Sequence, residues 1–342
     1  MRVLVTGHNG YIGSVLVTAL QAADVDVVGL DNDLFADCTF GVTPADPPSL
    51  RMDIRDVAAS HLRGFDAIIH LAALSNDPLG DIDPRCTYSI NHAASVRLAQ
   101  LAKGAGVSRF LFASSCSLYG GARDELLRED AAVNPLTPYG VSKIRTEQDL
   151  AAMADDDFSP TFLRNATAYG VSPRLRVDLV INNLVGFAVT TGEILIQSDG
   201  TPWRPVVHVE DICRAFIAIL DAPRERVHNE AFNVGRTEEN FRISELAQAV
   251  KAALPGCTVT LAEGGGPDAR CYRVDCGKLA RTLPEFKPQW TVRRGIEELC
   301  VAYRRFGLTS EEFCGARYSR IKQIRKLQLE GRLDATLRRH WP

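Results

Sequence analysis

Residues 3–13 read VLVTGHNGYIG, an apolar run closed by three glycines in the spacing GxxGxxG. The run predicts a short buried strand, and the apolar spacing of residues 11–23 predicts a helix directly after it. Glycines at such a junction permit a tight turn, a close approach of the backbone to a ligand, and close packing of the helix on the sheet. The helix N-terminus would then face an anion such as a pyrophosphate. The glycines alone also fit an ordinary strand–turn–helix connection, so the motif needs support from elsewhere in the chain.

That support comes from an acid at the end of the next predicted strand. Residues 24–31, DVDVVGLD, have the pattern of a strand, and Asp31 closes it 18 residues after Gly13. A carboxylate at this place binds the hydroxyls of an adenosine ribose and repels a 2′-phosphate. The glycine loop and Asp31 together predict a dinucleotide site that prefers NAD(H) to NADP(H). Asp53 and Ile54, after a third expected strand, are candidates for contact with the adenine.

Strand-like and helix-like segments alternate along the first half of the chain. Apolar strand-like runs occupy residues 66–73, 108–115 and 160–166, and amphipathic helical stretches occupy residues 87–105 and 138–153. This alternation predicts an α/β fold, a doubly wound parallel sheet with helices on both faces. The alternation loosens after residue 170. We therefore expect an NAD-binding Rossmann domain in residues 1–170, with return segments near 204–235, and a smaller C-terminal α/β substrate lobe with further helices in residues 171–342.

The composition argues against several classes of partner. A formal net charge of −3 on 342 residues provides no basic field for nucleic acid or acidic membrane lipids. The nine cysteines show no CxxC pair and no metal-ligand spacing, so we expect reduced thiols and no metal site. No apolar run approaches the ~18 residues needed to span a bilayer. Because the first strand begins directly after Met1, we expect no signal peptide and a cytoplasmic protein.

A second constellation lies in residues 137–143, TPYGVSK. Thr137 suits a helix N-cap and Pro138 suits the first helical position. Tyr139 and Lys143 then lie four residues apart on one face of the helix. A nearby ammonium lowers the pKa of a phenol and so favours a phenolate that can take a proton from a hydroxyl. From this spacing alone, a surface Tyr/Lys pair is the alternative.

Taken in order, the motifs resemble those of the extended short-chain dehydrogenase/reductase family. The likeness is closest to its NAD-dependent nucleotide-sugar epimerase/dehydratase branch, of the UDP-glucose 4-epimerase type. The matching segments are TGHNGYIG (6–13), LD (30–31), MDI (52–54), HLAA (70–73), INHAAS (90–95), SSCSLYG (114–120), YGVSK (139–143), LRNATAYG (163–170), NNLV (182–185), WRPVVHVED (203–211) and FNVG (232–235). The resemblance covers essentially the whole chain except a family-variable tail, residues 303–342.

This resemblance implies a role for each matching residue. Tyr139 would be the general base, Lys143 its electrostatic partner at the nicotinamide ribose, and Ser115 the hydroxyl that binds the reacting group. It implies NAD as cofactor, contacted by Gly7, Gly10, Tyr11, Ile12, Gly13, Asp31, Asn32, Asp53, Ile54, Leu71, Ala72, Ala73, Asn91, Tyr139 and Lys143. It implies a nucleotide-diphosphate sugar as substrate, contacted by Ser75, Ser117, Thr167, Asn183, Leu184, Arg204 and Arg270, with the two arginines at the diphosphate. A homodimer through the helices at 87–105 and 138–153 is also implied.

The segment SSCSLYG (114–120) narrows the expected reaction. In the resembling branch, the 4,6-dehydratases carry Asp-Glu at the positions of Cys116 and Ser117, and the decarboxylases typically carry Glu at that of Ser117. Elimination needs such an acid/base pair, which a thiol and a hydroxyl replace poorly. We therefore expect an epimerase that acts at C4 through a 4-keto intermediate. A 4-ketoreductase or dehydrogenase is the first alternative, then a dehydratase or decarboxylase, and last a non-catalytic NAD-binding protein.

Overall fold

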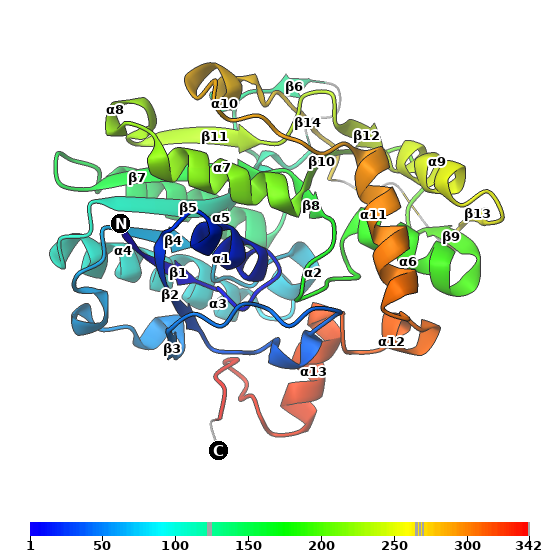
Figure 1. The fold of residues 1–342 in the computed structure, drawn as a ribbon, viewed down its shortest axis with the longest axis horizontal. Coiled ribbons are helices and arrows are strands. Elements are labelled where there is room, and N and C mark those ends of the chain that lie inside the picture. Colours follow the sequence, from blue (N-terminus) through cyan, green and yellow to red (C-terminus); the bar gives the residue numbers. More distant parts are fainter. Residues whose placement is uncertain (122–124, 264–265, 267, 269, 341–342) are drawn as a thin grey trace.

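The computed structural model describes residues 1–121, 125–263, 266, 268 and 270–340, and a seven-stranded parallel sheet dominates this part of the chain (Figure 1). The strand order is β11-β7-β5-β4-β1-β2-β3. The strands are β1 (Arg2–Thr6), β2 (Asp26–Asp31), β3 (Ser49–Arg51), β4 (Ala67–His70), β5 (Arg109–Ser115), β7 (Ser159–Asn165) and β11 (Glu230–Val234). The chain runs outward from β1 through β2 to β3, and outward from β4 in the other direction. A crevice is expected between β1 and β4, where the strand order reverses.

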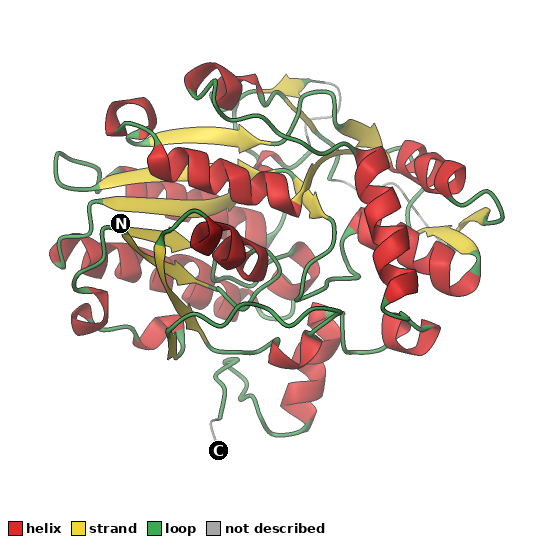
Figure 2. Ribbon diagram, viewed as in Figure 1, coloured by secondary structure: helices red, strands yellow, loops and turns green. Residues whose placement is uncertain are grey.

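Helices cover both faces of this sheet (Figure 2). On one face lie α1 (Gly13–Ala22) and α7 (Val209–Asp221), and on the other lie α4 (Ala94–Gly104) and α5 (Pro138–Ala151). Neighbouring residues of β1 face opposite cores, Val5 toward α1 and Leu4 toward α4, because side chains alternate along a strand. Both faces are therefore apolar, and the strand is a continuous apolar run in the sequence. The predicted doubly wound Rossmann fold is confirmed.

A second core lies beside the sheet, on the right of Figure 1. It joins α6 (Val180–Thr191), α9 (Ile243–Ala253) and α11 (Val292–Arg305) to the two-stranded sheet of β9 (Glu193–Ile196) and β13 (Thr258–Leu261). Between the cores runs the three-stranded sheet of β8 (Thr167–Tyr169), β10 (Trp203–His208) and β12 (Asn240–Arg242). From β10 the chain returns to the large sheet through α7 and β11 before it forms β12. The division into a domain of residues 1–170 and a lobe of residues 171–342 stays a proposal.

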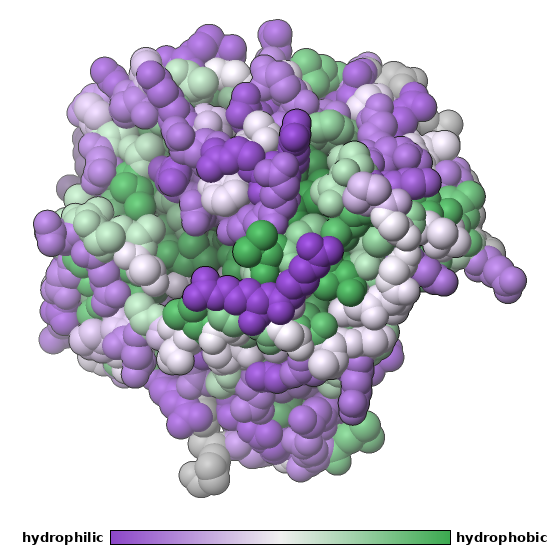
Figure 3. Space-filling view, turned by 45° about the vertical axis from the view of Figure 1, so that its right-hand side comes forward, coloured by the Kyte–Doolittle hydropathy of each residue, from purple (hydrophilic) through white to green (hydrophobic). Residues whose placement is uncertain are grey.

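Short elements complete the described chain. They are η1 (Ala36–Cys38), η2 (Ile54–Asp56), η3 (Ala59–Leu62), α2 (Asp77–Gly80), α3 (Pro84–Thr87), the π-helix η4 (Tyr88–Ala93), η5 (Cys116–Tyr119), β6 (Leu126–Leu127), α8 (Arg224–Val227), β14 (Arg273–Val274), α10 (Gly277–Thr282), α12 (Ser310–Cys314) and α13 (Arg320–Leu329). Figure 3 shows hydrophobic residues gathered in the hollowed middle of one face, with hydrophilic residues around them. Every helix within the described residues is too short or too polar to cross a lipid bilayer.

Candidate active site

One cavity of about 800 Å³ extends along the carboxyl ends of the central strands. Its walls come from the loops after β1, β2, β3 and β4, the end of β5, the start of α5, and segments of the second core. The cavity brings together residues that are far apart in the sequence. Those predicted at the site that line it are Gly7, Gly10, Tyr11, Ile12, Gly13, Asp31, Asn32, Asp53, Ile54, Leu71, Ala72, Ala73, Ser75, Ser115, Ser117, Tyr139, Lys143, Thr167, Asn183, Leu184, Arg204 and Arg270.

The glycine loop fits a diphosphate because side chains are sterically excluded from it. Gly7 has φ +74°, and a Cβ there would lie 2.8 Å from the backbone nitrogen of Ala72. A Cβ on Gly13 would lie 2.1 Å from the carbonyl oxygen of Gly7. The backbone can therefore approach a ligand closely at the N-terminus of α1, where unpaired N–H groups favour an anion. The side chain of Tyr11, in the same loop, is held away from this stretch of backbone because its hydroxyl donates to the carbonyl of Gly170 at 2.7 Å.

Asp31 stands at the end of β2, as the sequence predicted, and lines the cavity. Its carboxylate accepts backbone N–H groups from Asn9 at 3.0 Å and Asp33 at 2.8 Å, which fix its orientation. Burial raises the pKa of the Asp31 carboxyl, while the positive potential of nearby His8 opposes that rise. The place and the orientation suit the hydroxyls of an adenosine ribose.

The carboxylate of Asp53 is less available to bind a ligand than expected. Both of its carboxylate oxygens bind the guanidinium of Arg55, at 2.9 and 2.6 Å, and one also caps the N-terminus of η2. Although burial raises it, these hydrogen bonds hold the pKa of the Asp53 carboxyl below its usual range. Asp53 and Ile54 line the cavity. We infer that these two residues mainly form the cavity wall at the end where an adenine would bind.

The three expected catalytic side chains meet where α5 faces the end of β5. Thr137 caps α5 through the N–H of Gly140 at 3.2 Å, and Pro138 occupies the first turn, as predicted. Lys143 is buried, and its ammonium donates to the carbonyl of Ala113 at 2.7 Å. The ammonium lies 5.6 Å from the centre of the Tyr139 ring.

The pKa of Tyr139 is raised, whereas we expected Lys143 to lower it. Burial, followed by the negative charge of Asp77, raises the pKa of Tyr139 to about 12, and a hydrogen bond with Ser115 opposes the rise. Burial likewise lowers the pKa of Lys143 to about 7, against the pull of Glu147. The ammonium donates its nearest hydrogen bond to a carbonyl. The positive charge of Arg176 also opposes the rise in the pKa of Tyr139.

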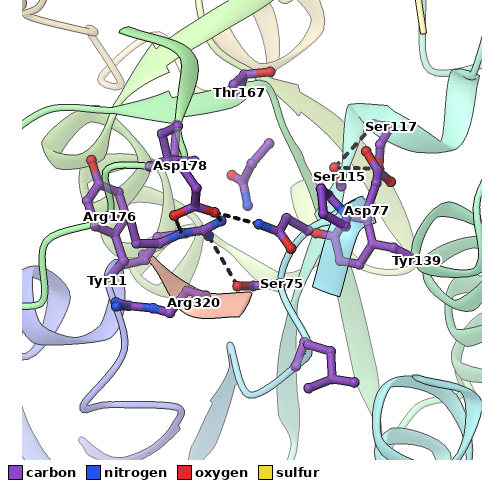
Figure 4. A pocket seen from close by; sticks show the side chains of 18 of the residues that line it. Tyr11, Ser75, Asp77, Ser115, Ser117, Tyr139, Thr167, Arg176, Asp178 and Arg320 are labelled. Carbon is purple, nitrogen blue, oxygen red and sulfur yellow. Dashed lines mark hydrogen bonds and ion pairs between the residues drawn. The ribbon is translucent and has the colours of Figure 1, made fainter. Parts of the chain in front are cut away.

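Ser117 acts on Ser115. The hydroxyl of Ser117 donates to Oγ of Ser115 at 2.9 Å, and the N–H of Ser117 donates to the same atom at 3.1 Å (Figure 4). Since Oγ of Ser115 accepts two donors, its own proton must point elsewhere, toward Tyr139 and the cavity. Ser115 is therefore set up as a donor at the place where a reacting hydroxyl would lie. Ser117 was expected to bind substrate, and this geometry gives it a positioning role as well.

Asn91 lies behind the cavity instead of on it. It is buried in the π-helix η4, and its side chain is bound on both sides to the backbone of Leu74, at 2.8 and 3.0 Å. Its amide also reaches Ser142 of α5 at 3.3 Å. Asn91 thus ties the loop after β4 to the catalytic helix. The expected direct contact with the cofactor is replaced by this bracing role.

Arg204 and Arg270 lie at the cavity edge and share one carboxylate. Both bind Oδ2 of Asp268, at 2.6 and 2.7 Å, and Arg270 also binds Asp77 at 2.7 Å. Two guanidinium groups face two carboxylates, so their charges cancel. The role of these arginines at a diphosphate stays a proposal.

Five charged residues that line the cavity were not predicted from the sequence: Asp77, Arg176, Asp178, Asp268 and Arg320. Arg176 is buried and binds Asp178 through two nitrogens, at 3.1 and 2.6 Å, and Ser75 at 3.1 Å (Figure 4). Although burial raises it, Arg176 holds the pKa of the Asp178 carboxyl low, so this group is ionised and cannot serve as an acid. Asp77, at the start of α2, accepts a hydrogen bond from Thr137 at 2.6 Å. The run RLRVD (174–178) follows a recognised motif, but only the fold shows that alternate residues of it face the cavity.

A buried ion pair supports the reacting end from behind. Glu147 of α5 and Arg164 of β7 are in contact at 2.7 Å, with exposed side-chain fractions of 6% and 8%. Glu147 also accepts a hydrogen bond from Ser114, the neighbour of Ser115. Cys116 is fully buried, and its thiol donates to the carbonyl of Arg164 at 3.1 Å. The thiol therefore packs beneath the site and points away from it.

Comparisons with known proteins agree with this geometry. A model of the NAD dependent epimerase/dehydratase family matches residues 3–235. The UDP-glucose 4-epimerase of Lactobacillus helveticus is 31% identical over 311 residues, which is 84% of this chain and 92% of that protein. MoeE5, solved in complex with UDP-glucuronic acid and NAD, is 30% identical, with a TM-score of 0.77, over 89% of this chain and 99% of its own.

A third relative catalyses a different reaction. DesIV, a dTDP-glucose 4,6-dehydratase from Streptomyces venezuelae solved with NAD, is 26% identical, with a TM-score of 0.78, over 91% of this chain and 99% of its own. The likeness thus spans epimerases and dehydratases, all on the same fold. Because the family match covers most of the chain, including the glycine loop and the Tyr139 helix, the chain is an enzyme of the NAD dependent epimerase/dehydratase family.

Proposed function

We propose that the protein epimerises a nucleotide sugar at C4 through a 4-keto intermediate. One observation carries the proposal: the reacting end holds Tyr139, Lys143 and the linked hydroxyls of Ser115 and Ser117, where eliminating relatives are expected to carry carboxylates. Asp178, a carboxylate that lines the cavity, is paired with the buried guanidinium of Arg176. The site is therefore suited to moving a proton to and from a sugar hydroxyl. It is less suited to eliminating a hydroxyl group.

Bound NAD+ would supply a hydride acceptor that can return the hydride to either face of the sugar. Three residues supply the other parts of this reaction. Tyr139 takes the proton of the C4 hydroxyl and later returns it, as a general base and then a general acid. Ser115 donates a hydrogen bond to the reacting oxygen, because its proton is directed into the cavity by Ser117. Lys143, held by the carbonyl of Ala113, stands beside the phenol where a cofactor ribose could accept a further hydrogen bond.

The proposed substrates are a UDP-hexose and its uronate. MoeE5, the 30% identical neighbour, has been solved with UDP-glucuronic acid and with UDP-glucose. Incubation of the purified enzyme with each sugar nucleotide, followed by proton NMR, tests the proposal. We expect conversion of one of them to its C4 epimer, with no net formation of NADH. A 4-ketoreductase, the main alternative, would consume one NADH for each product molecule and release the oxidised cofactor.

We expect Asp31 to determine the choice of cofactor. The wild type should bind NADP+ at least 10–100-fold more weakly than NAD+, since like charges brought together cost several kcal/mol. Asp31→Asn removes the charge and keeps an acceptor oxygen for one of the two N–H groups that bind it. It should narrow this ratio to below about 5-fold, a remaining preference of about 1 kcal/mol. Asp33→Asn, outside the cavity lining, is the matched control and should leave the ratio unchanged. Calorimetric Kd values decide; equal affinities in the wild type would refute the assignment.

The two serines should differ in their effect on turnover. Ser115→Ala removes a donor to the reacting oxygen and should lower kcat by about 10–100-fold, as hydrogen bonds to charged groups contribute about 1.5–3 kcal/mol. Ser117→Ala leaves its N–H in place and should lower kcat by less than about 5-fold, the value of one neutral hydrogen bond. Steady-state kinetics of both variants test this order. A larger loss in Ser117→Ala than in Ser115→Ala would reverse the assigned roles.

We also propose a cytoplasmic homodimer that forms through η4, α4 and α5. The family resemblance supports the dimer, and all nine cysteines are free thiols, as suits a reducing compartment. Light scattering of the purified protein would show twice the chain mass. A monomer at micromolar concentration would discard this proposal.

A further inference from the structure

Residues 319–340, which comprise α13 and the chain after it, fold back against the cofactor end of the large sheet. Figure 1 shows this segment in red beneath β2 and β3. We call it the clasp. Four of its apolar side chains are buried in one cluster with residues of the loops after β2 and β4. The clasp contributes Ile324, Leu327, Leu333 and Leu337, and the loops contribute Leu34, Leu74, Leu79 and Cys86.

Polar contacts tie the clasp to two loops that line the adenosine end of the cavity, the end that holds Asp31 and Asp53. Arg339 donates to the carbonyl of Asn32 at 3.3 Å and also to that of Asp33. In the loop after β3, Arg55 donates to the carbonyl of Thr336 at 2.8 Å. Arg338 pairs with Asp56 of that loop at 2.7 Å. The clasp therefore bridges the loops after β2 and β3, and residues of both loops line the cavity.

The clasp also forms part of the cavity wall. Arg320 and Ile321 line the cavity, and Figure 4 shows Arg320 beside Tyr11 of the glycine loop. The guanidinium of Arg320 is 1% exposed, donates to the carbonyls of Arg174 and Leu175 at 2.8 and 3.2 Å, and lies 4.3 Å from the ring of Phe35.

The hydrogen-bond partners of the buried Arg320 cation are backbone carbonyls, which carry only partial negative charges. Within the described residues, Arg320 takes part in none of the ion pairs, and burial lowers its pKa to about 10. A buried cation is costly unless a counter-charge lies near it. Because Arg320 borders the cavity that the glycine loop also lines, a bound diphosphate can supply that counter-charge.

We propose that the clasp retains NAD in the enzyme: it closes the adenosine end of the site, and Arg320 adds positive charge next to the cofactor diphosphate. The residues fit this role, since Arg338, Arg339 and Thr336 contact the two loops that carry Asp31 and Asp53. Retention of the cofactor suits a reaction in which the same NAD molecule accepts and returns the hydride. The proposal goes beyond the C4 reaction, because cofactor exchange can be measured without any sugar nucleotide.

The double variant Arg338→Ala/Arg339→Ala tests the closure. The holoenzyme is mixed with radiolabelled NAD+, and the exchange of bound cofactor is followed over time. We expect exchange to become at least about 10-fold faster, because loosened loops act mainly on the dissociation rate. Lys326→Ala removes an exposed cation of α13 that pairs only weakly with Glu330, at 3.8 Å, and should exchange as the wild type does. Unchanged exchange in the double variant would overturn the proposal. Should that variant not fold, the single Arg338→Ala variant, which loses one half-exposed ion pair, decides in the same way.

A second pair of variants tests the charge. Arg320→Gln keeps donors for the two carbonyls but removes the cation, and should raise the Kd for NAD+ by about 10-fold, or 1.4 kcal/mol. Arg320→Lys keeps the charge and should restore the wild-type Kd to within about 3-fold, less than 1 kcal/mol. Equal Kd values for the glutamine variant and the wild type would remove Arg320 from the proposal. If the clasp variants exchange NAD as the wild type does and the enzyme still epimerises its substrate, the clasp proposal fails and the proposed function stands. The two failures are therefore distinguishable.

Discussion

Replacement of Tyr139 by phenylalanine is expected to lower kcat by about 10²–10⁴-fold, the usual contribution of a general base. The phenol lies at the reacting end of the cavity and is hydrogen-bonded to Ser115. The change removes one hydroxyl and keeps the ring, so the fold and the NAD affinity should survive. Steady-state kinetics measure the loss, and circular dichroism and NAD calorimetry measure the two controls. Near-normal turnover in Tyr139→Phe would end the proposed mechanism.

A titration of the same variant tests the electrostatics of the site. In protein stripped of cofactor, the tyrosinate absorbance of the wild type minus that of Tyr139→Phe should appear only above pH 10, because burial and Asp77 raise the phenol pKa to about 12. A raised pKa favours the neutral phenol, and positive charge brought near the ring would favour the phenolate. A difference spectrum that titrates below pH 9 would show that Lys143 lowers the pKa after all.

Glu147→Gln is expected to destabilise the fold by about 3–5 kcal/mol, the largest effect on stability among the changes considered. The change leaves the guanidinium of Arg164 buried without its counter-charge, which is the costly way to break an internal ion pair. It also weakens the bond from Ser114 that holds the end of β5 in place. Urea unfolding at neutral pH measures the loss.

Asp149→Asn is the matched control for this variant. Asp149 lies two residues further along α5, and its pairing with His92 at 2.6 Å is at the surface, with half of the aspartate side chain exposed. Surface pairs contribute about 0–1 kcal/mol, so the control should unfold close to the wild type. Similar losses in both variants would mean that the buried position of Glu147 has no special effect on stability.

The fold could be predicted because its signals are local. The apolar strand runs, the glycine loop and the TPYGVSK helix start each fix a conformation over a few residues, and the alternation of strands and helices fixes the parallel sheet. Asp31 could be placed for the same reason, since it follows directly from the end of β2.

The electrostatics of the site could not be predicted, because they depend on contacts between distant segments. The phenol pKa of Tyr139 is raised partly by Asp77, 62 positions away along the chain. Lys143 binds the carbonyl of Ala113, which no side-chain pattern reveals. Arg176 and Asp178 are ordinary surface residue types in the sequence, and only the fold shows that both line the cavity and that Arg176 is buried.

The fate of the C5 hydrogen tests the central claim, 4-epimerisation without elimination, most directly. The enzyme is incubated in deuterium oxide with UDP-glucose and with UDP-glucuronic acid, and the products are analysed by NMR and mass spectrometry. Dehydration exchanges the C5 hydrogen with solvent, whereas epimerisation at C4 through a retained hydride leaves it in place. The account predicts a C4 epimer without deuterium at C5, no 6-deoxy product and no release of CO2. Deuterium at C5 together with a 4-keto-6-deoxy product would contradict it, and would make Asp77 the first carboxylate to examine as the acid.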